Sequence, residues 1–428
     1  MSTAVTGLTC SVCGAHVEIS TPFTWRCPNA SEIDRKHVLR FDVPIDVFRP
    51  TDDINPFIAY RTYLAVDSFG ASVGLDDATR ESIIRELDDA VTAIDGVGFT
   101  RTPLLRADAL SDALGFTTDG GIWIKDETHN VAGSHKARHL FTELVHLLMA
   151  ERAGLAPWAS PEQRPMLAIA SCGNAAIAAS TLAAAVQWPI AVHVPTGASS
   201  SVMEKLQSLN ADIRVCPRLE TDPAGDPCVL RFREVVAAGA IPFGVQGTEN
   251  AWCLDGGRTI GWEILKEIGH RVDRIFIQVG GGAFASSVAS SMRNVGTHPK
   301  LHAVQTEGCA PLARAWEHAQ TSGGTRDAGK RWADCMWAWE SEPHSLADGI
   351  LDDETYDWIG ILDGMSDTGG SPVVATEAAV VRAHHMASEF TDISVSPTGS
   401  AGLAGVLQIR GSIADDERIV VVFSGVAR

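Results

Sequence analysis

"KDETHNVAGSHKARHL", residues 125–140, joins an apolar run of strand length to an amphipathic helix. The apolar run before it is Gly121 to Ile124, and Phe141 continues the helix beyond it. Lys136 therefore lies at the end of a loop that joins a strand to a helix. Proteins with α/β sheets bind their ligands at such loops, beyond the carboxyl ends of the strands. A solvated helix start explains the same residues equally well from this stretch alone, so the interpretation depends on the rest of the chain.

The composition is that of a globular enzyme. The 428 residues exceed the size of one ordinary core and predict two domains. A formal net charge of −19 argues against a nucleic-acid partner, which requires a broad basic face. No apolar run reaches the length that spans a bilayer, and the N-terminus has no signal-peptide pattern. We expect a cytoplasmic protein that binds a small molecule, without a nucleic-acid or membrane partner.

Short apolar runs alternate with amphipathic segments from residue 121 onward. The runs of strand length are residues 121–127, 165–171, 190–195, 212–217, 273–279, 301–307 and 418–424. The helical segments include residues 76–94, 134–154, 174–187 and 200–211, and a further helix is predicted over 55–66. Strands that are apolar throughout, separated by helices, indicate parallel sheets covered on both faces. We predict an α/β fold with two open, mostly parallel sheets.

Three of the nine cysteines gather near the N-terminus: Cys10, Cys13 and Cys27. Their spacing is three quarters of a zinc ribbon. The mirror spacing puts the fourth ligand at Ala30, which cannot bind a metal, and His16 or His37 could replace it. A ribbon that binds zinc and a degenerate ribbon that has lost it both fit the sequence. We assign residues 1–37 to this small zinc-ribbon-like element.

A polar turn follows the apolar run 165–170 and opens a helix. Its residues are Ser171, Cys172, Gly173 and Asn174. Free backbone N–H groups at such a turn suit a carboxylate. Ordinary helix capping explains the turn equally well when it is considered alone.

Three glycines, Gly280 to Gly282, follow the apolar run 273–279 at the start of the next helix. They allow the backbone to wrap around a phosphate at the helix N-terminus. The same residues, with Ala285 and with Glu307 further along, also fit the fingerprint of a dinucleotide-binding turn. An NAD-dependent oxidoreductase is therefore an alternative, but it would give Lys136 no function.

One cofactor would use all these features together with Ser424, which ends the last apolar run. Pyridoxal phosphate needs a lysine amine, a cradle of N–H groups for its phosphate, a polar contact to its phenolic oxygen and a partner for its ring nitrogen. Lys136, the three glycines, Asn174 and Ser424 supply these groups in that order.

The chain resembles the fold type II pyridoxal phosphate enzymes, the group of tryptophan synthase β, threonine synthase and the serine and threonine dehydratases. Residues 125–138 resemble the Schiff-base lysine segment, and "SCGNAA" resembles the asparagine loop. "VGGGAF" resembles the phosphate loop, and "VVVFSG" resembles the terminal strand whose hydroxyl meets the pyridine nitrogen. The order and spacing agree over roughly residues 100–428, and among these members the chain is most similar to threonine synthase-like proteins.

The resemblance implies a division of the chain. Residues 38–136 plus 246–428 would form a large cofactor-binding domain, and residues 137–245 a small domain that carries the asparagine loop. The cofactor would lie in the cleft between them, with Lys136 at the boundary as cofactor lysine and catalytic base. The polar turn at Ser171–Asn174 would hold the substrate carboxylate. Members of this group also lead us to expect a homodimer.

Three residues depart from the family pattern, and they limit what can be said of the substrate. His135 replaces the usual phenylalanine, Ala137 replaces the acidic residue of threonine synthases, and Ala283 in the phosphate loop replaces a common fourth glycine. Since the first two lie beside Lys136, where the leaving group departs, the substrate of any one member cannot be transferred to this chain.

The resemblance implies removal of the α-proton of an amino acid and loss of its β-substituent. We expect a lyase or β-replacement enzyme that acts on a hydroxy- or O-phospho-amino acid. Threonine synthase is the alternative, because Asn130, Ser134 and Arg138 match positions that hold the substrate phosphate in that group. His135 could contribute as an acid or pack as a structural side chain. A catalytically silent protein that binds the cofactor is a further alternative.

Overall fold

Strand β13 (Arg418–Phe423) is apolar from Ile419 onward because helices cover both faces of its sheet. Ile419, Val421 and Phe423 pack into one hydrophobic cluster, and Val420 and Val422 pack into another. This alternation follows from the two-residue period of a strand. The computed structural model, which describes residues 5–43, 47–223 and 225–428, shows that β13 lies at the centre of the larger of two such sheets.

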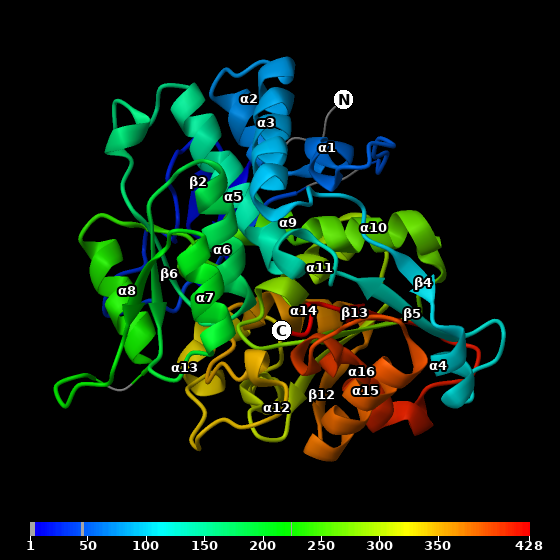
Figure 1. Cartoon of the computed structure of the whole chain (residues 1–428). Helices are drawn as coiled ribbons and strands as arrows, with labels where there is room; N and C mark the ends of the chain where they lie inside the picture. Colours follow the sequence, from blue (N-terminus) through cyan, green and yellow to red (C-terminus); the bar gives the residue numbers. More distant parts are fainter. Residues whose placement is uncertain (1–4, 44–46, 224) are drawn as a thin grey trace.

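The strands form three sheets (Figure 1). The six-stranded sheet has the order β12-β11-β10-β13-β5-β4 and is parallel except for its edge strand β4. The four-stranded sheet has the order β8-β7-β6-β9 and is parallel throughout. The three-stranded sheet, β2-β1-β3, is antiparallel. The remaining strands are β1 (Gly7–Cys10), β2 (His16–Glu18), β3 (Leu39–Phe41), β4 (Leu104–Arg106), β5 (Gly121–Asp126), β6 (Leu167–Ala170), β7 (Ile190–Val194), β8 (Asp212–Val215), β9 (Ile241–Pro242), β10 (Arg274–Gln278), β11 (Lys300–Thr306) and β12 (Ser371–Ala375).

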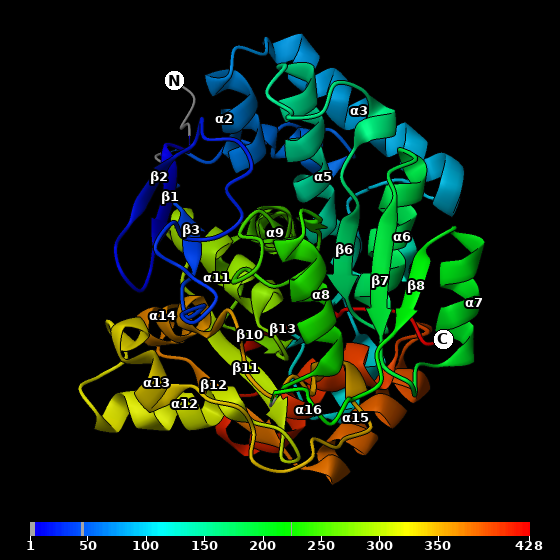
Figure 2. The same ribbon diagram turned by 90° about the vertical axis from the view of Figure 1, so that its left-hand side faces the viewer.

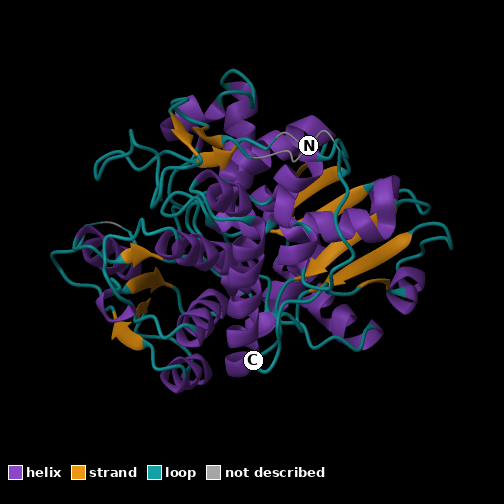
Figure 3. Cartoon of the chain, turned by 90° about the horizontal axis from the view of Figure 1, so that it is seen from above, coloured by secondary structure: helices purple, strands orange, loops and turns teal. Residues whose placement is uncertain are grey.

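Helices lie between and around the two larger sheets, as the view from above shows (Figure 3). Helix α16 packs on one face of the six-stranded sheet, and α10, α11 and α14 contribute to the cluster on its other face. The helices are α1 (Pro56–Ala59), α2 (Ala65–Ser72), α3 (Asp77–Asp95), α4 (Asp108–Ala113), α5 (Lys136–Arg152), α6 (Asn174–Ala185), α7 (Ser200–Ser208), α8 (Pro227–Ala237), α9 (Cys253–Gly256), α10 (Arg258–Ile268), α11 (Ala283–Asn294), α12 (Pro311–Thr321), α13 (Trp332–Cys335), α14 (Trp358–Thr368), α15 (Glu377–Phe390) and α16 (Pro397–Ile409).

The α/β fold with two mostly parallel sheets is confirmed. Every strand of the four-stranded sheet falls between residues 137 and 245, and every strand of the six-stranded sheet falls outside that range and after residue 38. The division into a small and a large domain stays a prediction. The N-terminal sheet runs beyond the predicted boundary at residue 37, because β3 at Leu39–Phe41 is its third strand. Figure 2 shows this sheet and the strands β6 to β8 on opposite sides of the molecule.

The helix predicted over 55–66 is wrong as one continuous element. Helix α1 ends at Ala59, a short 3-10 turn covers Arg61–Tyr63, and α2 begins at Ala65. Backbone N–H groups of Ala65 and Val66 donate to the carboxylate of Asp255, at 3.0 and 3.1 Å. This buried carboxylate caps the start of α2, so the helix has to begin anew there.

A cluster of buried charges fixes the start of α5. The guanidinium of Arg138 donates to Glu127 at 2.9 Å and to Glu263 at 2.6 Å, and Lys125 contacts Glu263 at 2.6 Å. All four side chains are fully buried, and the two cations balance the two carboxylates. The cluster joins β5, the loop after it, α5 and α10. Burial alone would raise the pKa of Glu263, but the neighbouring cations lower it, so the carboxylate stays charged.

We predict that Arg138→Met destabilises the protein by about 3–5 kcal/mol, because it leaves the buried carboxylate of Glu127 without a cation and that of Glu263 with Lys125 alone. Arg152→Met at the other end of α5 is the matched control. Arg152 is 49% exposed and pairs with Glu86 at 3.4 Å, so its loss costs under about 1 kcal/mol. Chemical and thermal unfolding measure both. Equal stability of the two variants would contradict this account of the cluster.

Candidate active site

Lys136 is the first residue of α5, directly after a turn that reverses the chain. Ala132 and Gly133 in this turn both have left-handed backbone conformations, with φ of 54° and 67°. The amide of Asn130 holds the turn together, since it donates to Glu127 at 3.0 Å and to the carbonyl of Ser134 at 3.2 Å. The turn thus fixes the position of Lys136 at the start of α5.

The Lys136 side chain has no hydrogen-bond partner among the residues that the structure describes. Burial lowers the pKa of its amine, and the nearby Asp352 and Cys253 only partly oppose that effect. A larger fraction of the amine is therefore uncharged at neutral pH than for a lysine in water. An uncharged amine can act as a nucleophile and as a base.

The end of β13 lies beside Lys136. The backbone N–H of His135 donates to the carbonyl of Ser424 at 3.1 Å, and the amide of Gln278 donates to the Ser424 hydroxyl at 2.6 Å. Because an amide nitrogen can only donate, the hydroxyl accepts in this bond and keeps its own proton for another partner. Ser424 can therefore donate to a ring nitrogen, as the sequence predicts.

Asn174 also lies near the end of β13, although it follows a strand of the four-stranded sheet. It begins α6, and its side-chain oxygen accepts from the Nε of Arg428 at 3.0 Å. A Cβ on Gly425, next to Ser424, would lie 2.7 Å from the Asn174 amide nitrogen, so this close approach requires a glycine. The amide nitrogen of Asn174 thus faces the end of β13.

The polar turn before Asn174 leaves a helix start without a side-chain cap. The N–H of Gly173 lies 3.4 Å from the Ser171 hydroxyl, and no side chain of the described residues accepts from the first turn of α6. Cys172 beside them is exposed. The uncapped N–H groups can bind a carboxylate, and the predicted function of this turn stays a prediction.

The glycine loop opens α11 in the same way. Gly282 has a φ of 97°, and no side chain caps the first turn of α11 after it. The N–H of Gly281 donates to the carboxylate of Asp352, and a Cβ on Gly280 would lie 2.3 Å from that carboxylate. Burial raises the pKa of Asp352 to about 6 against the attraction of Lys136. The loop therefore already binds an anionic group next to the lysine.

The structure brings most of the predicted site residues together. Shared contacts link one group of them around the start of α5 and the end of β13: Asn130, Ser134, His135, Lys136, Asn174 and Ser424. The electrostatic contact between Lys136 and Asp352 links this group to Gly280 and Gly281, with Gly282 and Ala283 following in the chain. The ring of His135 packs on Phe284 at 4.3 Å.

The structure argues against a phosphate-binding function for Arg138 and against an acid function for His135. Within the described part of the chain, the guanidinium of Arg138 donates to the buried carboxylates of Glu127 and Glu263 and to two buried threonine hydroxyls, so it is not free to bind a substrate phosphate. Burial lowers the pKa of His135 well below its usual value, so the ring is neutral and is a poor proton donor at neutral pH. Its Nδ1 lies 3.0 Å from the Ser424 carbonyl, which makes it a packed side chain that positions the strand end.

Asp352, Gln278 and Cys253 are site residues that the sequence did not indicate. Gln278 had one recognisable signal, since it is a polar residue at the end of an otherwise apolar strand. Asp352 lies in a segment without helical or strand periodicity, and Cys253 is one of six scattered cysteines. Only the fold places these two beside Lys136.

Comparisons with known proteins agree with this arrangement. Residues 97–425 match the family described as "Pyridoxal-phosphate dependent enzyme". L-threonine ammonia-lyase of Thermotoga maritima is 28% identical over 200 residues, which are 46% of this chain and 45% of that enzyme. Cysteate synthase of Methanococcoides burtonii is 23% identical over 412 residues, 94% of this chain and 88% of that enzyme. Maize serine racemase has a similar fold, with a TM-score of 0.60, 20% identity and coverage of 80% of this chain and 92% of that one.

The chain belongs to the family of pyridoxal phosphate-dependent enzymes, as its resemblance predicts. The cofactor is therefore pyridoxal phosphate, and the interpretation of the glycine loop as a dinucleotide site is wrong. The residues present fit this cofactor: a lysine amine with a lowered pKa, a glycine-rich helix start for the phosphate and a free hydroxyl proton for the ring nitrogen. The carboxylate of Glu307, which the dinucleotide interpretation needed, accepts the N–H of Glu377 at 2.7 Å.

We predict that borohydride reduction of the holoenzyme attaches the cofactor to Lys136. The pKa of the Lys136 amine is lowered, and this amine has no hydrogen-bond partner among the described residues, whereas the fully buried Lys125 is ion-paired with Glu263 and Glu267. Peptide mapping by mass spectrometry should find the adduct on Lys136 alone and no adduct in Lys136→Ala. An adduct on Lys125, or an unchanged adduct in Lys136→Ala, would refute the assignment.

We predict that Asp352→Asn binds pyridoxal phosphate roughly tenfold more tightly near neutral pH, because it removes a repulsion on the order of 1.4 kcal/mol. A carboxyl with a pKa of about 6 is charged above that pH and neutral below it. The affinity of the wild-type protein should therefore approach that of the variant as the pH falls through 6. Titration with the cofactor at several pH values measures the difference. Weaker binding to the variant throughout would contradict the prediction.

Proposed function

We propose that the protein is a lyase or β-replacement enzyme that acts on a hydroxy- or O-phospho-amino acid. The observation that carries this proposal is the position of the Lys136 amine, whose pKa is lowered by burial, between the glycine loop and the asparagine turn. Pyridoxal phosphate supplies a conjugated ring that accepts the electron pair of a deprotonated α-carbon. The protein has to supply a base, a site for the carboxylate and a place where the β-substituent can leave.

Side chains in the site can take these functions. The N–H groups of the Ser171–Asn174 turn would hold the substrate carboxylate, since no side chain caps them. The Lys136 amine would remove the α-proton. The Ser134 hydroxyl is fully buried and has no hydrogen-bond partner among the described residues, so it is suited to bind the departing oxygen. Ser424 would donate to the ring nitrogen and leave it without a proton, which favours early loss of a β-substituent.

Two of the curated relatives support this class of reaction by their names. One is an ammonia-lyase that acts on threonine, and the other is a synthase whose similarity extends over nearly the whole chain. The match to the lyase spans less than half of either chain, so its substrate is not transferred here.

Threonine synthase stays the second candidate. The observation in its favour is the position of Asn130 and Ser134 at the turn before Lys136. The ion pairs of Arg138 with Glu127 and Glu263 argue against threonine synthase, because the guanidinium is then not available to bind the substrate phosphate. A protein that binds the cofactor without turnover is the third possibility.

The division into a large and a small domain and the homodimer stay proposals that rest on the family resemblance. The cytoplasmic location stays a proposal that rests on the N-terminal sequence, which has no signal-peptide pattern. In the described part of the chain, no helix has both the length and the apolar character needed to cross a bilayer.

We predict turnover of at least one of serine, threonine and O-phosphoserine by the holoenzyme. Elimination releases an oxo acid and ammonia, whereas replacement requires an added nucleophile such as a thiol or sulfite. Oxo acid, ammonia and phosphate are measured separately, and Lys136→Ala is the inactive control. Its rate should fall by several orders of magnitude, because the catalytic amine is lost.

The same assay separates the alternatives. Formation of threonine from O-phosphohomoserine would establish the second candidate instead. Absence of turnover of every one of these amino acids, with the cofactor bound to Lys136, would favour the silent protein.

A further inference from the structure

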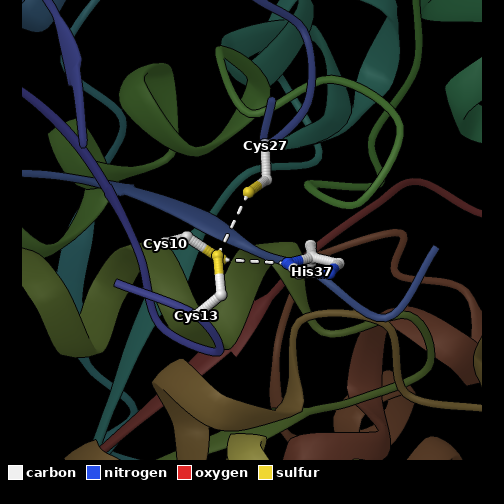
Figure 4. A group of neighbouring side chains, drawn as sticks. All are labelled: Cys10, Cys13, Cys27 and His37. Atoms are coloured by element: carbon white, nitrogen blue, oxygen red, sulfur yellow. Dashed lines mark hydrogen bonds between the residues drawn. The ribbon is translucent and has the colours of Figure 1, made fainter. Parts of the chain in front are cut away.

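We propose that Cys10, Cys13, Cys27 and His37 bind a structural zinc ion that holds the N-terminal loop against the wall of the Lys136 site. The four side chains converge on one point from three separate places in the chain (Figure 4). Their ligand atoms all lie within 4.8 Å of one another. The cluster precedes the region that matches the family, which begins at residue 97.

The distances are those of a tetrahedral metal site. Zinc bonds of about 2.3 Å to sulfur and 2.0 Å to nitrogen place neighbouring ligand atoms roughly 3.5–3.8 Å apart. The Sγ atoms of Cys13 and Cys27 are 3.5 Å apart, and the Sγ of Cys10 is 3.4 Å from the Nδ1 of His37. Three thiolates and one imidazole form a closed set without an open position, which is typical of a structural site.

Groups around the ligands orient them as in metal sites. Each sulfur has an N–H donor at 3.4–3.5 Å: the backbone of Val12 for Cys10, and the side chain and backbone of Asn29 for Cys13 and Cys27. The far nitrogen of the His37 ring lies 3.5 Å from a carboxylate oxygen of Asp34. A carboxylate in this position fixes the ring and the tautomer that presents Nδ1 to the metal.

The fourth ligand is His37, and neither Ala30 nor His16 has that function. The pairing of β1 with β3 brings His37 to the cysteines, since the N–H of Ser11 donates to the carbonyl of Val38 at 2.9 Å. His16 lies on the partly exposed face of the N-terminal sheet, where its ring contacts Thr9 and Asp42. The mirror spacing of a ribbon did not apply, because the last ligand lies in the segment that leads into β3 and not in a second knuckle.

The loop between β2 and β3 has no regular secondary structure, yet it forms contacts with the enzyme body. The N–H of Phe23 donates to His146 at 3.3 Å, and the indole of Trp252 donates to the carbonyl of Thr24 at 3.0 Å. The N–H of Ala251 donates to the carbonyl of Trp25 at 2.9 Å. A metal bound by Cys27 within this loop and by His37 near its end would hold the loop in place without a hydrophobic core of its own.

The contacts of the loop continue directly to the catalytic lysine. Trp252 is followed by Cys253, whose carbonyl lies 2.7 Å from the ring of His139 and whose thiol is close enough to Lys136 to affect the pKa of its amine. Loss of the metal would therefore loosen residues 249–253 and, through them, one wall of the site. This part of the inference rests on the proposed function of Lys136, whereas the zinc site itself does not.

The first test measures metal in the full-length protein, purified without chelators, by inductively coupled plasma mass spectrometry. We expect zinc in a one-to-one ratio to the chain. His37→Ala and Cys27→Ser should lose it, and His16→Ala, a histidine of the same sheet, should keep it. If Cys27→Ser does not fold, titration of the wild-type protein with a chelator still decides the question. Absence of zinc after growth in zinc-supplemented medium, or a Cys13–Cys27 disulfide in its place, would overturn the proposal.

The second test follows hydrogen exchange in the wild-type holoenzyme and in His37→Ala. Deuterium uptake should increase in peptides that cover residues 20–37 and 246–256, and it should not change in residues 167–194, which contain β6 and β7. Unchanged uptake in residues 246–256 after proven loss of zinc would refute the link to the Lys136 wall. Neither measurement depends on turnover, so failure of the proposed reaction would leave both results interpretable.

Discussion

The neutral cluster of Lys125, Glu127, Arg138 and Glu263 is the interaction on which the site depends. Charges that are completely buried require partners, because their desolvation costs several kcal/mol for each ion. Here the partners come from a strand, a loop and two helices, so they can satisfy one another in only one arrangement of those elements. Lys136 lies two residues before Arg138 on the same helix. The position of the Lys136 amine thus depends on a set of buried ion pairs in which the amine itself takes no part.

The same chain segment contains two lysines in different electrostatic environments. Lys125 forms ion pairs with Glu263 and Glu267, whereas the Lys136 amine has no ion pair or hydrogen bond among the described residues. Burial lowers the pKa of the Lys136 amine, and the charges of Asp352 and Cys253 oppose that shift only in part. The lysine without a partner is thus the one that we propose as the cofactor lysine. The glycine loop and the uncapped turn at α6 follow the same principle, since their N–H groups are left free for anions.

The sequence predicts the parts of the fold that depend on local pattern. Strand β13 is apolar at every position after Arg418, which indicates a strand of a parallel sheet without any knowledge of its neighbours. Strand β12 was missed because two glycines precede it and Pro372 lies within it, and β4 was missed because it is a three-residue edge strand. Lys136, Asn174 and the three glycines were identified as a set, although each has an ordinary alternative by itself. Partners that come from distant segments, such as Asp352 beside Gly281 or His37 beside Cys10, could not be predicted from spacing because only the folded chain places them together.

The pairing of β5 with β13 has a consequence for how the enzyme is made. Residues 121–126 lie beside residues 418–423, so the centre of the large sheet joins segments roughly 300 positions apart. During synthesis on the ribosome, β5 cannot pair with β13 until residues 418–423 have emerged. The four-stranded sheet uses residues between 167 and 242 and can assemble long before that. A nascent chain would therefore carry a folded small unit next to exposed apolar strands for much of its translation, which is the interval in which a chaperone would protect it from aggregation.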